Sequence, residues 1–69
     1  MEMISVTSSN IEAVGYDEGS GTLQVEFKNG STYQYFDVPI RVFEGLRDAG
    51  SVGAYLSSNI KGVFRFSRV

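Results

Sequence analysis

The sequence predicts a small α+β domain: a three-stranded antiparallel β-meander, followed by two short helices packed on one face and a C-terminal strand or extension. Three observations lead to this prediction. Two runs of alternating apolar and polar residues flank Asn29-Gly30, a pair typical of β-hairpin turns. Apolar residues at helical spacing then follow Pro39. A chain of 69 residues supplies one core, so residues 1–69 are expected to form a single domain.

The meander is expected to begin at residues 11–16. Both faces of this first strand carry apolar side chains, so the sequence does not assign the face that points inward. Residues 1–7 fit either a short edge strand or a frayed end. After a glycine-containing turn at 17–21, Leu23, Val25 and Phe27 alternate with polar residues and therefore share one face of the second strand.

The connection from the second strand to the third decides which side chains face the core. A two-residue turn would place Val25 opposite Gln34 and mix polar side chains into the apolar face. A three-residue loop at 28–30, with Gly30 left-handed in a bulge, places Val25 opposite Tyr33 instead. Because a slip of one residue exchanges the two faces, burial favours the three-residue loop.

The first helix is expected to start at Pro39, since the first helical position needs no amide donor. The Asp37 side chain is a candidate cap for this start, and Gly50 a candidate C-terminal cap. The inward stripe consists of Ile40, Val42, Phe43 and Leu46.

Ser51 is the expected N-cap of a second helix, which is expected to end by Gly62. Its inward stripe consists of Val52, Tyr55, Leu56 and Ile60. Residues 63–68 alternate again and are expected to form the last strand or an extended tail. The predicted core consists of Leu23, Val25, Phe27, Tyr35, Phe43, Leu46, Leu56 and Ile60.

Composition argues against several classes of function. The chain has no cysteine and no histidine, so disulfides, thiolate chemistry, the usual general base and the commonest metal ligand are missing. No nucleophile–base pair is visible among the carboxylates, so we expect no enzyme, no catalytic residues, no metal and no cofactor. No small-molecule substrate is evident. Without an apolar run of membrane-spanning length or a secretory signal, a cytoplasmic setting away from the membrane is expected.

Charge is divided unevenly along the chain, whose net charge is −2. Residues 1–40 carry six acids and one base, whereas residues 41–69 carry five bases and two acids. No acidic residue follows Asp48. Such an asymmetry can mark a face that binds a partner, although charge runs more often form a solvated face.

Two groups of residues combine aromatic or basic side chains. Tyr33 and Tyr35 alternate on one strand, and such rings either stack against single-stranded bases or fill the sheet–helix interface. The C-terminal segment alternates basic and aromatic side chains. Such a pattern is typical either of a surface that binds the phosphates and bases of a nucleic acid, or of an edge strand whose Phe side chains face the core and whose Arg side chains keep the edge soluble. The candidate contacts for RNA or a protein partner are Tyr33, Tyr35, Lys61, Phe64, Arg65, Phe66 and Arg68.

The chain resembles the KTSC domain, a module named for the C-terminus of some lysyl-tRNA synthetases that also occurs as a free-standing small bacterial or phage protein. The resemblance covers the chain from Ser8 to Val69. It is carried by Ser8-Ser9-Asn10-Ile11, Val14-Gly15-Tyr16-Asp17, Tyr33-Gln34-Tyr35-Phe36-Asp37-Val38-Pro39, Gly53-Ala54-Tyr55 and Asn59-Ile60-Lys61.

The resemblance implies a module whose function is unassigned, with RNA binding indicated only by the synthetase context. This chain departs from the family pattern at Ser57-Ser58, where an arginine is common, and at Phe64 and Phe66, where the ends are often tyrosine-rich and basic. Two hypotheses follow: an RNA- or tRNA-binding accessory domain, and a protein-interaction module or small phage-type accessory protein without a nucleic-acid role. The sequence does not indicate the oligomeric state.

Overall fold

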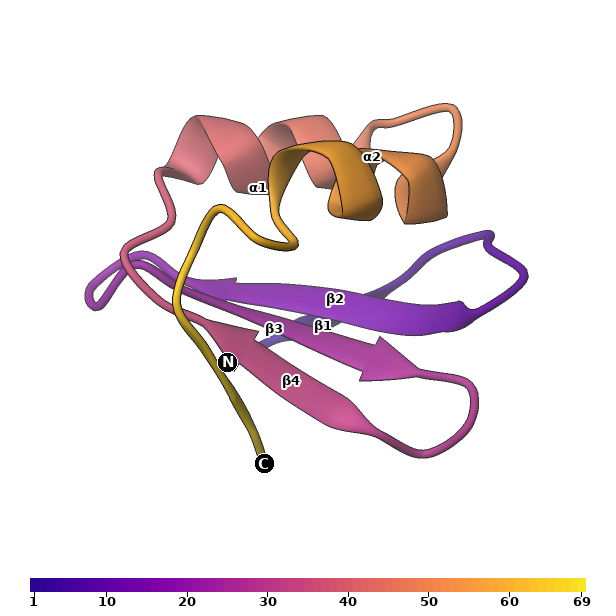
Figure 1. Cartoon of the computed structure of the whole chain (residues 1–69), viewed down its shortest axis with the longest axis horizontal. Coiled ribbons are helices and arrows are strands. Elements are labelled where there is room, and N and C mark those ends of the chain that lie inside the picture. The colour runs from indigo at the N-terminus through magenta and orange to yellow at the C-terminus, as the bar shows by residue number, and fades with distance from the viewer.

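A computed structural model describes all residues, 1–69, as a five-stranded sheet covered by two short helices (Figure 1). Neither helix is long and apolar enough to cross a membrane. The elements in chain order are β1 (Met3–Ser5), β2 (Ile11–Asp17), β3 (Thr22–Phe27), β4 (Thr32–Tyr35), α1 (Ile40–Arg47), α2 (Val52–Asn59) and β5 (Phe66–Arg68).

The sheet is an antiparallel array in the order β1-β2-β3-β4-β5. The predicted α+β class and the meander of β2, β3 and β4 are confirmed. Residues 3–5 form an edge strand rather than a frayed end, and the C-terminal segment pairs with β4 as the opposite edge strand. Both helices lie over the same face of the sheet in Figure 1, so no helix covers the other face.

The β3–β4 hairpin has the predicted register. Val25 lies opposite Tyr33, and Leu23 lies opposite Tyr35. The backbone amide of Phe27 donates to the Ser31 carbonyl at 2.8 Å, which closes the loop over residues 28–30. Gly30 has φ +93°, the left-handed conformation predicted for it.

An irregularity in β2 explains why the inward face of this strand could not be assigned from the sequence. The pairing with β3 shifts between Ile11 and Ala13, so Glu12 is an extra residue in β2. As a result, Ile11 and Val14 lie opposite Phe27 and Val25, on the face that the helices cover. Both side chains are fully buried although they are three residues apart, a spacing that simple alternation does not allow.

The start of α1 differs from the prediction. Pro39 has extended backbone angles and precedes the helix as its N-cap residue, without a side-chain cap. Asp37 does not cap the helix: it takes φ +57°, and its carboxylate pairs with Arg65. This turn also leaves Ile40 exposed at the first helical position, contrary to the predicted stripe.

The remaining helix ends follow local hydrogen bonding. α1 ends at Arg47, and Gly50 is not its cap, because Gly50 has no left-handed φ and lies beyond the C-cap residue Asp48. The Ser51 hydroxyl accepts from the Ala54 amide at 3.3 Å, which confirms Ser51 as the N-cap of α2. α2 ends before Gly62, which takes φ +77° in the following turn.

The core lies between the sheet and the helices. Seven of the eight predicted core residues are buried, whereas Phe27 is half-buried at the edge of the cluster. The buried cluster consists of Ile11, Val14, Leu23, Val25, Tyr35, Val38, Phe43, Leu46, Val52, Leu56 and Ile60. The additional members come from the irregular strand β2, the turn before α1 and the start of α2.

Candidate binding surface

The outer edge of β5 is an open strand edge. The Phe36 amide donates to the Arg65 carbonyl and the Val69 amide donates to the Thr32 carbonyl, both at 2.9 Å. Backbone groups alternate in direction along an antiparallel strand. The N–H and C=O groups of Phe66 and Arg68 therefore point away from β4, where no further strand lies.

Apolar side chains gather beside this edge. A hollow of about 570 Å³ is lined by Phe36, Gly62, Val63, Phe64, Arg65 and Phe66. Val63, Phe66 and Val69 are each about 60% exposed, and they account for half of the large apolar side chains that the fold leaves exposed. We call residues 61–69 together with Phe36 the β5 edge surface.

Cations border the same surface. Arg65 Nη2 lies 2.7 Å from Asp37 Oδ2, and the Arg65 guanidinium lies over the Phe36 ring at 5.7 Å from its centroid. Arg68 Nη2 donates to Ser31 Oγ at 3.1 Å. These side chains are exposed, as is Lys61. Exposed ion pairs contribute little stability, so the cations are free to exchange their present contacts for an anionic partner.

The structure separates the two predicted tyrosines. Tyr35 is 3% exposed and lies in the core, so its ring offers no face to a base. Burial raises the pKa of the Tyr35 hydroxyl, and the neighbouring Tyr33 raises it further. Tyr33 is half-buried and is flanked by Phe27, at 5.6 Å and 86°, and by Phe66, at 5.8 Å and 42°. The exposed ring of this group is that of Phe66.

The other predicted contacts lie along one edge. Phe64, Arg65 and Phe66 line the same hollow, and Arg68 pairs with Tyr33 across the β4–β5 ladder. Lys61 is exposed in the turn that precedes the hollow. Sequence reasoning missed Phe36 and Val63 as lining residues. Val63 belongs to the alternating C-terminal segment, whereas nothing in the sequence brings Phe36 to residues 62–66 before β5 is paired with β4.

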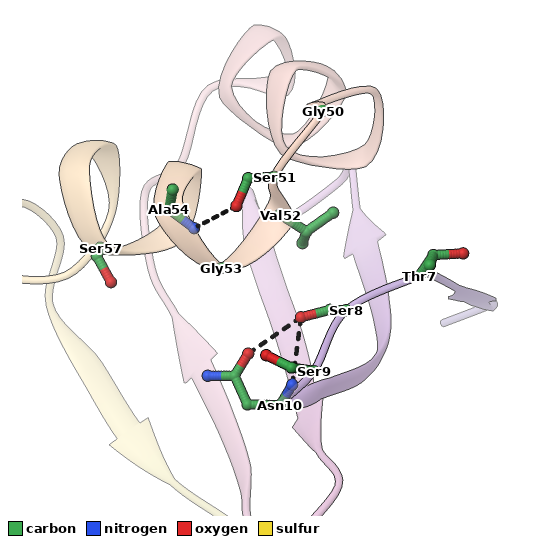
Figure 2. Close-up of a pocket in the computed structure, with 10 residues that line it drawn as sticks. All are labelled: Thr7, Ser8, Ser9, Asn10, Gly50, Ser51, Val52, Gly53, Ala54 and Ser57. Atoms are coloured by element: carbon green, nitrogen blue, oxygen red, sulfur yellow. Dashed lines mark hydrogen bonds between the residues drawn. The ribbon is translucent and has the colours of Figure 1, made fainter.

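A second, polar hollow lies between the β1–β2 connection and the start of α2. It measures about 420 Å³ and is lined mainly by small polar side chains, as Figure 2 shows. Ser8 Oγ donates to Asn10 Oδ1 at 3.0 Å, and the Ser51 hydroxyl is occupied by its capping bond. A Cβ at Gly53 would lie 3.3 Å from Asn10 Oδ1. Glycine at this helical position therefore lets the turn approach α2.

The carboxylates form no cluster that could hold a metal ion. Asp17 accepts from the Gly19 amide and the Ser20 hydroxyl within its turn. Asp48 binds Arg47 at 2.9 Å, and this hydrogen bond lowers the pKa of Asp48. The carboxylates of Asp17, Asp37 and Asp48 therefore all have structural partners.

Known proteins share both the fold and much of the sequence of this chain. The crystal structure of a KTSC domain protein from Yersinia pestis superposes with a TM-score of 0.93 at 35% identity, covering 99% of this chain and 96% of that protein. A protein of Tsukamurella paurometabola is 43% identical over 63 residues, which are 91% of this chain and 94% of that protein.

A third relative is much longer. A lysine–tRNA ligase of Nostoc is 39% identical over 67 residues, 97% of this chain but only 12% of the ligase. The homologous region lies at the C-terminus of such ligases. The family model for the KTSC domain matches residues 7–64. This match and the similarity to proteins of the same length show that the chain belongs to the KTSC domain family.

Proposed function

We propose that this KTSC domain is a non-enzymatic module that binds a protein partner through the β5 edge surface. The observation that carries the proposal is the combination, on one open strand edge, of unpaired backbone groups at Phe66 and Arg68 with exposed apolar side chains. Edge strands that carry exposed apolar residues readily pair with another chain.

The arrangement of the rings favours a protein partner over bases. Stacking of successive bases requires ring faces that are open to solvent. Tyr35 is buried, and Tyr33 has Phe27 and Phe66 as neighbours, so Phe66 remains as the ring with a largely exposed surface. A single exposed ring beside an apolar hollow is better matched to an apolar side chain of a protein than to a series of stacked bases.

RNA is the second candidate, and the relationship to lysine–tRNA ligases is the observation that favours it. Lys61, Arg65 and Arg68 would contact phosphates, with Phe66 or Phe64 for stacking. Three phosphate contacts on a single strand would give a log–log salt slope of about −2. Such a slope indicates an accessory contact rather than tight binding on its own.

The two candidates are separated by titrating the isotope-labelled domain. A library of random displayed peptides would first be selected on the immobilised domain, and each selected peptide, a transfer RNA and a single-stranded oligonucleotide would then be added during amide NMR measurements. We expect the selected peptides to shift the amide signals of residues 61–69 and Phe36. The proposal would be overturned if RNA alone moved these amide signals, with a log–log salt slope of about −2, or if every selected peptide mapped to other surfaces.

A further inference from the structure

We propose that the partner is an extended peptide that adds to β5 as a sixth, antiparallel strand, with an aromatic residue between acidic ones. This inference rests on the proposed protein-binding function and specifies its mode and its ligand chemistry. Three features of β5 support it: the directions of its backbone groups, the order of its side chains and the charge around the strand.

The outward backbone groups of β5 fix how the peptide would be held. The N–H and C=O groups of Phe66 and Arg68 point outward, so two residues of an added strand can each exchange a pair of hydrogen bonds with them. An antiparallel strand continues the pattern of the sheet, in which all four existing pairings are antiparallel. The peptide residue opposite Ser67 would direct its own N–H away from β5.

The side chains of β5 fix which peptide residues fit. Read from its N-terminus, an antiparallel peptide meets Arg68, Ser67, Phe66 and Arg65 in turn. An acidic residue suits the position opposite Arg68, and an aromatic residue opposite Phe66 would lie beside the apolar hollow. A second acidic residue suits the position opposite Arg65. The expected ligand therefore reads acid, any residue, aromatic, acid.

Charge favours such a peptide over a second copy of this chain. The β5 edge surface carries Lys61, Arg65 and Arg68, and the acidic residue in contact with it is Asp37, through its exposed pair with Arg65. Two copies joined β5 to β5 would gather the basic side chains of both copies along one edge, which is electrostatically unfavourable. An acidic peptide would instead neutralise this edge.

The test uses the whole domain and synthetic peptides carrying Glu-Thr-Phe-Glu at their centre, with binding followed by fluorescence anisotropy. Methylating the backbone nitrogen of the peptide's phenylalanine removes a donor aimed at β5 and should weaken binding at least about tenfold. The matched control is methylation of the threonine nitrogen, whose N–H points away from β5 and whose loss should change binding little. Equal effects of the two methyl groups would overturn strand addition while leaving a protein-binding function intact.

Orientation and charge have separate controls. A peptide with the reversed order, Glu-Phe-Thr-Glu, matches parallel addition, and equal or tighter binding of it would overturn the antiparallel register. Arg68→Glu should weaken binding about threefold to tenfold, and replacing the first glutamate of the peptide by lysine should restore it. Arg47→Glu makes the same charge change beside β1 and should leave binding unchanged. Failure of the charge reversal to restore binding would overturn the assignment of the acid opposite Arg68.

A second copy is tested by sedimentation of the domain alone. The proposal expects a monomer whose β5 amides do not shift with protein concentration. Self-association through β5 would overturn the assignment of this edge to an acidic peptide. Absence of binding for every acidic–aromatic peptide, together with binding of library peptides to the same surface, would overturn this ligand chemistry but not the proposed function.

Discussion

Replacing Gly30 by alanine should isolate the energetic cost of one backbone conformation in this domain. Gly30 has φ +93°, and an added Cβ would meet no atom within 4 Å. Gly50 offers the same open space without a positive φ, so it is a matched control within the same chain. Any difference between the two alanine variants therefore reports the conformation of the backbone rather than packing.

The expected magnitudes follow from these two environments. An L-residue forced into the left-handed region costs about 1–2 kcal/mol, which should appear in Gly30→Ala. Gly50→Ala should instead stabilise the domain by about 0.4–1 kcal/mol, because alanine restricts the unfolded chain. The free energies of unfolding of the two variants should thus differ by about 1.4–3 kcal/mol.

The assay is reversible thermal and urea unfolding followed by far-ultraviolet circular dichroism. For a domain of this size, Gly30→Ala should lower Tm by about 4–16 °C, at about 4–8 °C for each kcal/mol. The urea m-value should stay the same, since the native fold is retained. Gly30→Val should cost more than Gly30→Ala, because a β-branched residue resists positive φ further. Equal melting temperatures for the two alanine variants would refute the role of Gly30 in setting the hairpin.

Three further outcomes are expected. Leu46→Ala removes a fully buried side chain and should cost about 2–5 kcal/mol in denaturant unfolding; an unchanged midpoint would mean that α1 does not depend on this contact. Ser51→Ala removes the cap on the Ala54 amide and should cost about 0.5–2 kcal/mol, whereas Ser51→Asp should retain most of the stability. Because burial raises the pKa of Tyr35 above the ordinary value of 10.0, the unfolded chain loses its proton first, and stability should fall as pH rises above that value. Tyr35→Phe should reduce this alkaline loss, which pH-dependent melting curves would measure; an unchanged loss would assign it to Tyr16, whose pKa burial also raises.

The hairpin could be predicted from the sequence because its determinants are local. The alternation in β3, the Asn29-Gly30 pair and the penalty for burying Gln34 together favour a single register, which the structure has. Ser51 was likewise identified from its immediate neighbours, since a cap bonds to an amide three residues away.

The remaining features depend on pairings that no short stretch encodes. Glu12 is an extra residue only relative to β3, so the inward face of β2 is defined by the partner strand. Asp37 was a reasonable cap candidate, but its carboxylate is occupied by Arg65, 28 residues later in the chain. This ion pair between two distant parts of the chain also shows that the acidic and basic halves of the sequence meet at this point of the fold.

The candidate surface was predicted only in part for the same reason. The basic and aromatic character of residues 61–68 is visible in the sequence. Tyr35 was predicted both as a core residue and as a candidate contact, and its place opposite Leu23 beneath the helices leaves it only in the core. Phe36 joins the surface because β5 pairs back onto β4 after two helices.

The position of the chain ends in the sheet has a practical consequence for attaching the domain to anything else. β1 and β5 are the outermost strands, separated by four strand-to-strand spacings that span on the order of 20 Å. A label, surface tether or larger protein joined ahead of Met1 leaves the domain beside Gly15 of β2, not in line with β5. The same group joined after Val69 would continue directly from β5 and crowd the strand to which the proposed partner would add. Immobilisation through the N-terminus is therefore the arrangement under which this domain can report its ligands.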